Sequence, residues 1–217
     1  MAARSSDSLL SPRISSPDIP DSLGTATPSR AADLHASALV LHGDVDLAHS
    51  SLEQCRVTAD AASVDLTGAT LMDVELSTPR IASMMMRDAT VRRLRISGGR
   101  IGTLDLSSAR IGELELVDVR IDYLTLGGAR GEDILLSGCV LHSLDLPQAE
   151  LTRVRFESCR ADEVDPRGMR ATHVDLRGLD ADAFLDVSSL RGTTLSPFQA
   201  QLLAPVMAAG LGIRLRD

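Results

Sequence analysis

The feature that most constrains the fold of this chain is an apolar repeat of five residues. Almost every fifth position from 66 to 181 is apolar, and so is almost every fifth position from 64 to 179. The exceptions in these two series are Gly131, Pro166, Pro79 and Gly99. More than a hundred residues therefore share one pattern, which predicts a single repeated structural unit.

The charged residues follow the same register. Between residues 64 and 179 the chain has 15 arginines and 18 acidic residues, and none of them occupies either apolar series. Random placement would put about two-fifths of them there, because the two series take two positions of every five. Two residues of each repeat are therefore predicted to face a core, and the other three to face water.

Only a coiled backbone keeps both series on one side. An α-helix turns by about 100° per residue, so a step of five rotates by about 140° and spreads the apolar pairs around the cylinder. A straight strand places residues two apart on one face, but successive pairs would alternate between faces because five is odd. The chain must bend once per repeat, and stacked bends make a solenoid. In the second series large residues alternate with mostly small ones, which predicts an even number of repeats per coil.

These residues resemble the pentapeptide-repeat family, whose motif is a small residue, Asp or Asn, Leu or Phe, and two polar positions. The motif is carried by stretches such as Ala109-Arg110-Ile111, Ala149-Glu150-Leu151 and Val174-Asp175-Leu176. The resemblance covers residues 39–195 and implies an all-β fold, a right-handed quadrilateral parallel β-helix with about 20 residues in each square coil. The chain departs from the family motif in often having Arg at the middle position and in containing no Asn.

The chain divides into four predicted parts. Residues 1–30 are rich in Ser, Pro and Asp and predict a disordered tail, with a short binding motif as the alternative. Residues 31–63 repeat imperfectly and predict an irregular N-terminal coil that caps the solenoid, with a bulge or turn near 60–63 where the register changes. Residues 64–195 form the pentapeptide-repeat β-helix, and residues 196–217 a C-terminal helical cap.

The C-terminal helix is predicted from Ser196 and Pro197, which suit an N-cap and a first helical turn. Pro205 should kink or end its first stretch, and Gly210 should end the helix. Its apolar face is formed by Phe198, Leu202, Leu203, Val206 and Met207. We expect the helix to cover the open end of the core; a dimer interface, as in some members of the family, is the alternative.

Composition limits the partners. The net charge of −8 argues against direct binding of nucleic acid, which needs a basic surface. The sequence shows no signal segment and no apolar run that could span a bilayer, so we expect no membrane contact and a cytoplasmic location. Cys139 and Cys159 lie in the apolar series and are expected to be buried, reduced thiols. No metal-ligand spacing or phosphate-binding loop appears, so we expect no metal and no cofactor.

Square coils of this kind would stack the outward charges in columns. One column contains Arg80, Arg100, Arg120 and Arg160, interrupted by Val140. The other contains Asp65, Asp105, Asp145 and Asp165, interrupted by Met85 and Thr125. Such columns are usually solvated faces, in which neighbouring columns of opposite sign offset each other. The alternative is that these eight charged residues form a partner surface.

The pattern favours binding over catalysis. Catalytic residues usually lie on loops that project from a scaffold, and the register from 64 to 181 contains no insertion. We therefore predict a non-enzymatic protein-interaction scaffold whose partner is another protein, with a homodimer through the C-terminal helix as one form. The alternative function is a DNA mimic of the quinolone-resistance type that binds DNA gyrase or topoisomerase, which the resemblance implies; the many arginines in the repeats disfavour it.

Overall fold

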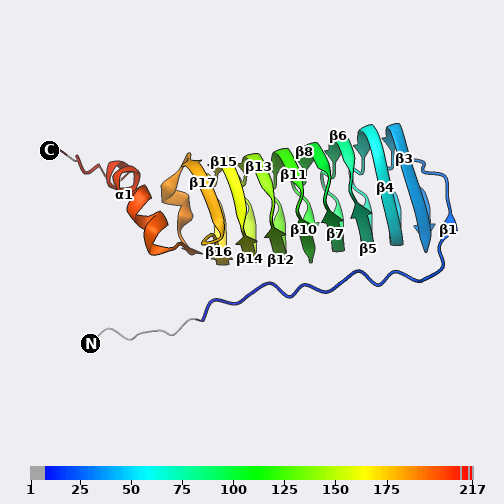
Figure 1. Cartoon of the computed structure of the whole chain (residues 1–217), viewed down its shortest axis with the longest axis horizontal. Helices are drawn as coiled ribbons and strands as arrows, with labels where there is room; N and C mark the ends of the chain where they lie inside the picture. Colours follow the sequence, from blue (N-terminus) through cyan, green and yellow to red (C-terminus); the bar gives the residue numbers. More distant parts are fainter. Residues whose placement is uncertain (1–7, 211, 215, 217) are drawn as a thin grey trace.

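The computed structural model describes residues 8–210, 212–214 and 216, and shows a parallel β-solenoid of about eight turns (Figure 1). Its first strands are β1 (Gly24–Thr25), β2 (Asp33–His35), β3 (Ser37–Asp46) and β4 (Ser51–Asp65). One stack of strands then contains β6 (Arg80–Met85), β8 (Arg100–Asp105), β11 (Arg120–Thr125), β13 (Val140–Asp145), β15 (Cys159–Asp165) and β17 (Leu179–Phe184). A second stack contains β5 (Thr70–Ser77), β7 (Thr90–Ser97), β9 (Arg110–Ile111), β10 (Leu114–Val117), β12 (Arg130–Ser137), β14 (Glu150–Glu157) and β16 (Arg170–Asp175). The chain ends with the 3-10 helix η1 (Val187–Leu190), β18 (Thr193–Thr194) and α1 (Pro197–Gly210).

Successive turns pair in register at a constant offset. Arg120 of β11 lies beside Arg100 of β8 on one side and beside Val140 of β13 on the other. The second stack keeps the same offset, as in the pair Leu94 and Leu114. A turn therefore holds four repeats of five residues, and the predicted all-β solenoid is confirmed.

Backbone bends explain why the apolar spacing alternates between two and three residues. Arg93, Asp133 and His173 lie within strands of the second stack with φ of +57°, +50° and +55°. Residues other than glycine rarely adopt this left-handed conformation, and it turns the chain sharply. The bend at Arg93 allows Val91 and Leu94, three residues apart, both to point inward, where each is at most 2% exposed.

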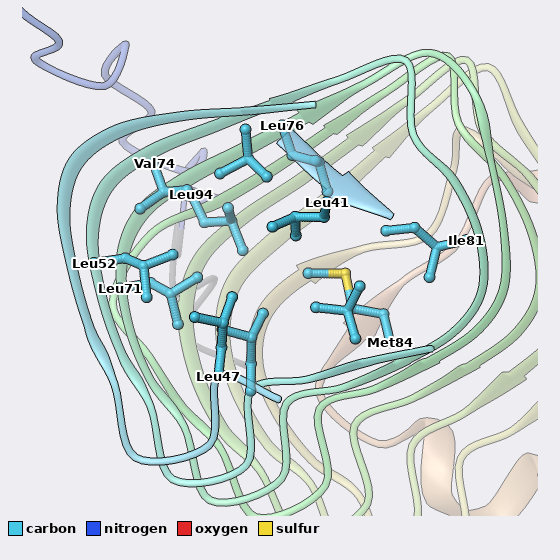
Figure 2. A pocket seen from close by; sticks show the side chains of 12 residues that line it. Leu41, Leu47, Leu52, Leu71, Val74, Leu76, Ile81, Met84 and Leu94 are labelled. Carbon is cyan, nitrogen blue, oxygen red and sulfur yellow. The ribbon is translucent and has the colours of Figure 1, made fainter. Parts of the chain in front are cut away.

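The interior is narrow, apolar and dry. Figure 2 looks into the first turns, where Leu47, Leu52 and Leu71 point from the wall into the core. A void of about 20 Å³ remains there, and all the side chains that line it are apolar. A buried water needs two to four polar partners, so this void stays empty. All three cysteines are buried and free, as expected for small apolar fillers.

Two exceptions in the apolar series, the exposed Gly99 and the buried Gly131, lie where a larger residue would clash with its neighbours. A Cβ on Gly99 would lie 2.2 Å from the backbone oxygen of Pro79 in the preceding turn, so the two backbones approach closely there. A Cβ on Gly131 would lie 2.6 Å from Cδ1 of Ile134 and 3.1 Å from Cδ2 of Leu151. These neighbouring side chains fill the room that a larger residue at position 131 would need.

The N-terminal turns are irregular. In the pairing of β3 with β4, Gly43 lies beside Ala61, whereas the next residue, Asp44, lies beside Ser63. The extra residue is Ala62 of β4, which has no partner in β3. The register change expected near 60–63 lies at this bulge, and it brings the irregular first turns into line with the regular coils that follow.

The C-terminal helix begins with a reciprocal cap. The backbone N–H of Gln199 donates to Oγ of Ser196 at 3.2 Å, and the N–H of Ser196 donates to Oε1 of Gln199 at 2.8 Å. This is the arrangement of a capping box. The helix ends at Gly210, as expected, but it continues through Pro205 as one element.

Residues 8–23 form an extended segment that we call the strap. The sequence alone predicts a disordered tail here, whereas the structure gives the segment a defined course. It runs beneath the second stack of strands, from the β1 end of the solenoid back to the end that carries β16 (Figure 1). Its half-buried residues are Leu9, Pro12, Ile14, Pro17, Ile19, Pro20 and Leu23, and most of the residues between them are exposed.

Candidate interaction site

The C-terminal end carries an exposed apolar stripe. Phe198, Leu202 and Val206 follow each other at intervals of four residues along α1, and their exposed fractions are 68%, 63% and 48%. Residues four apart lie on one face of a helix, so the three side chains form one continuous stripe. Exposed apolar residues scattered singly are normal, but an aligned set of large ones marks a contact surface.

A groove separates this stripe from the last turn. It has a volume of about 960 Å³, and Leu179 and Phe184 of β17 contribute to its wall opposite the helix. β17 pairs with β15 in the preceding turn, and its other edge lies at the end of the solenoid. A strand edge without a neighbouring strand, beside an apolar stripe, is a surface that proteins normally cover.

The opposite side of α1 does cover the core. Leu203 is half-buried and packs against the core, while its neighbour Leu202 is exposed. The side-chain amide of Gln199 donates to the carbonyl oxygens of Leu176 and Leu179, at 2.8 Å each. The bond to Leu179 pairs a carbonyl that would otherwise need a further turn, whereas the carbonyl of Leu176 also accepts the N–H of Leu179 at 3.0 Å. The predicted apolar face of the helix is therefore divided between a side that closes the core and a stripe that faces outward.

The arginine column forms as the square coil requires. Arg80, Arg100 and Arg120 pair directly in successive turns, followed by Val140 and then Arg160. Their side chains are exposed. Arg100 and Arg160 each reach an acid on the next turn, Asp122 at 2.7 Å and Asp182 at 2.9 Å.

Arg80 and Arg120, the other two arginines of the column, have a different environment. Within residues 8–210, Arg80 and Arg120 make no such ion pair. The column therefore offers positive charge at two positions, and is partly neutralised at the two others.

The acidic column is used mostly to shape turns. Oδ1 of Asp65 accepts the N–H of Thr67 at 2.9 Å, and Oδ1 of Asp105 and of Asp165 accept the corresponding bonds from the residues two positions later. Asp105 and Asp165 are only 4% and 3% exposed. Burial alone would raise the pKa of Asp105, but hydrogen bonds from Ser107 and Arg87 outweigh it and hold the pKa below its ordinary value. These carboxylates already have hydrogen-bond partners within the chain. Their spacing in the sequence does not predict this role in the turns.

Asp145 differs, because it accepts a hydrogen bond from the Tyr123 hydroxyl. This bond raises the pKa of Tyr123 to about 12. Because the folded-state pKa lies above the ordinary value of about 10, the bond stabilises the fold below pH 10 and is lost as the pH rises towards 12.

Tyr123 is the single tyrosine of a chain without tryptophan, so its titration can be followed directly by ultraviolet absorbance. We expect Asp145→Ala to lower its pKa towards 10, and Asp162→Ala, at an acid on the next turn that pairs with His142, to leave it near 12. An equal Tyr123 pKa in the two variants would contradict the assigned bond.

Within residues 8–210, no group of three or more His, Cys, Asp or Glu side chains is arranged to hold a metal ion. In the same part of the chain no helix is both long enough and apolar enough to cross a membrane.

Comparisons with known proteins find likeness to solved structures. No protein-family model matches the chain, and neither does any curated protein. One similar solved structure is that of trypsin-treated QnrB1, a plasmid-mediated fluoroquinolone resistance protein, with 16% identity, a TM-score of 0.32, and coverage of 86% of this chain and 100% of that one. Another is HetL, a pentapeptide-repeat protein involved in heterocyst differentiation regulation from the cyanobacterium Nostoc sp. strain PCC 7120, with 15% identity, a TM-score of 0.34, and coverage of 75% and 86%.

Likeness at this level carries no argument about function. The fold rests instead on the register and burial of the chain itself, which match the family resemblance seen in the sequence. With four five-residue repeats in each turn, this chain has the fold of a pentapeptide-repeat protein.

Proposed function

We propose that this protein is a non-enzymatic interaction scaffold whose C-terminal end binds a second copy of the chain. The observation that carries the proposal is the exposed stripe of Phe198, Leu202 and Val206 beside the open edge of β17. A two-fold symmetric contact brings the same patch of both copies together, and an apolar stripe on a helix is complementary to itself. The contact would bury both stripes and cover both strand edges.

The scaffold role is supported by the regularity of the coil. Strands from β5 to β17 keep the same offset from turn to turn, so no long insertion projects from this part of the solenoid to carry a catalytic loop. The exposed arginines at positions 80 and 120 remain a proposed second contact surface, suited to an acidic protein partner.

The alternative is a DNA mimic that binds DNA gyrase or topoisomerase. Such a mimic needs a long negative face. Here Arg80, Arg100 and Arg120 stack in consecutive turns, and Asp105 and Asp165 are buried and paired with arginines. The charge arrangement therefore favours the scaffold, and a supercoiling assay of gyrase with and without this protein separates the two functions.

Sedimentation velocity tests the dimer. We expect the full chain to sediment as a dimer and Leu202→Asp to sediment as a monomer, because a charge in the centre of an apolar contact costs at least about 2 kcal/mol of binding free energy. Gln201→Asp adds the same charge at the neighbouring exposed position and should remain dimeric. A wild-type chain that stays monomeric at micromolar concentration would refute the proposal.

A further inference from the structure

The strap contacts a single column of side chains along one corner of the solenoid. We call it the corner column; it consists of Asp73, Arg93, Glu113, Asp133, Arg153 and His173, one residue from each of six successive turns. Most of these residues have a left-handed backbone conformation, which marks the bend between two faces. The column therefore presents a line of polar side chains at one turn spacing, about 4.8 Å, along the axis.

The strap binds this column through its backbone. The N–H of Arg13 donates to Oδ1 of Asp133 at 2.9 Å, and the N–H of Asp18 donates to Oδ1 of Asp73 at 2.9 Å. Between them, the N–H and the hydroxyl of Ser15 both donate to Glu113. At the far end the N–H of Leu10 approaches Nδ1 of His173 at 3.5 Å.

The arginines of the column hold its acids in place. Arg93 makes two hydrogen bonds to Asp73, both of 2.6 Å, and Arg153 makes two to Asp133, of 2.6 and 2.8 Å. Two-point contacts of this kind fix the orientation of a carboxylate. Asp73 and Asp133 are therefore fixed acceptors, whereas Glu113, within residues 8–210, bonds to the strap without an arginine of its own.

The spacing of the contacts matches a polyproline II segment. The eight residue steps from Leu10 to Asp18 span the five spacings between the six turns of the corner column. A polyproline II chain rises about 3.1 Å per residue, or about 25 Å over eight residues, and five turns at strand spacing measure about 24 Å. Pro12 and Pro17 favour this conformation and lack an N–H, and they lie at positions that need none.

The apolar residues of the strap also lie against the solenoid. Leu9, Ile14 and Ile19 are spaced by five residues and are half-buried, while Arg13, Ser15 and Ser16 are exposed. An extended segment that turns some of its apolar residues towards a surface, and donates its N–H groups to fixed acceptors, is bound as a peptide ligand is bound. The strap is joined to β1 by a continuous chain, which gives it a high effective concentration at the column.

We propose that the corner column is a binding site for extended, proline-containing peptides, and that residues 8–20 of the chain are its resident ligand. The corner column binds mainly the backbone N–H groups of its ligand. Most side chains of the strap remain partly exposed. The strap is thus exchangeable: a peptide of the same character binds where the strap has been released. This site lies along the second stack of strands and is separate from the stripe on α1.

Binding of a fluorescent peptide with the sequence of residues 8–20 tests the proposal. The double variant Leu9→Asp and Ile19→Asp, made in the full chain, removes two half-buried strap contacts and leaves the Arg13-Ile14 bond unchanged. It should release the strap, and trypsin should then cleave after Arg13 at least about tenfold faster than in the wild type. We expect the peptide to bind this released variant at least about tenfold more tightly than the wild type, in which the tethered strap competes.

Variants of Glu113 provide the matched control. In the released variant, Glu113→Ala removes an acceptor and should weaken peptide binding at least about fivefold, whereas Glu113→Gln keeps an acceptor oxygen and should weaken it less. Glu163→Ala removes an exposed acid within β15, in the other stack of strands, and should have no effect. A peptide that fails to bind the released variant, or that binds equally well to its Glu113→Ala form, would overturn the proposal.

Discussion

Replacing Leu146 by aspartate should destabilise the solenoid by more than about 4 kcal/mol, because it removes a buried side chain and places an unpaired charge in an apolar interior. Leu146 is 3% exposed and belongs to the inward series. The interior around it is apolar and cannot pair with the new carboxylate, so the turns on either side must open to hydrate it. Urea unfolding followed by circular dichroism measures the loss.

The matched variant is Arg120→Asp. Arg120 faces outward from β11 and is exposed, so this change should alter the free energy of unfolding by no more than about 0.5 kcal/mol, although it reverses a full charge. The two variants thus introduce the same residue, aspartate, at an inward and at an outward position of the solenoid. Equal losses of stability would show that the assignment of inward and outward positions is wrong.

Gly99→Ala should be among the most damaging glycine-to-alanine substitutions, with a cost of about 3 kcal/mol. Gly99 has a φ of +77°, which an L-residue adopts only at a cost, and its new Cβ would meet the backbone oxygen and nitrogen of Pro79 at 2.2 and 2.6 Å. Backbone atoms cannot move aside as a side chain can, so the two turns must separate. Thermal unfolding of the variant measures the effect.

Gly128→Ala separates the two causes. Gly128 has a similar φ of +64°, but the nearest atom to an added Cβ is Oγ of Ser108 at 3.8 Å. Ser108 and Gln148, at the same position in the adjacent turns, already carry side chains at positive φ. We therefore expect a cost of about 1 kcal/mol or less, due to conformation alone. If Gly128→Ala were as damaging as Gly99→Ala, the close approach at Pro79 would not be the cause.

The coil could be predicted from the sequence because its physical basis is repeated more than twenty times. Each repeat places two apolar residues inward. Where one repeat is irregular, the regular repeats on either side still define the period. Even the exceptions follow from packing: Gly131 leaves room for Ile134, and Gly99 lets the backbone pass Pro79. The number of repeats in a turn was harder to predict from the sequence. A periodic pattern specifies that the chain bends, but not how many bends close a turn.

The site was harder to predict because it depends on contacts that are not periodic. The acidic column was identified by position, but only the structure shows that Asp105 and Asp165 cap turns with one side of their carboxylates. The helix was predicted, yet Gln199 gave no sign that it would pair the carbonyls of the last turn.

The sequence of the strap contains a weak five-residue periodicity, which its Ser- and Pro-rich composition obscures. Leu9, Ile14 and Ile19 repeat at five residues, and Pro12 and Pro17 repeat at the same interval. A few apolar residues among many Ser and Pro residues cannot form a core of their own, so the composition predicts a disordered tail. What orders the segment is a surface built by residues more than fifty positions away, which no local pattern reveals.

The central claim is that the inward series lies in a dry interior, and the reactivity of the cysteines tests it most directly. The chain has three cysteines, and Cys55, Cys139 and Cys159 are 0%, 0% and 3% exposed. The native protein should therefore leave all three thiols unreacted with a water-soluble disulfide reagent, and denaturant should release all three at once. Rapid reaction of the thiols in the native protein would contradict this account of the fold.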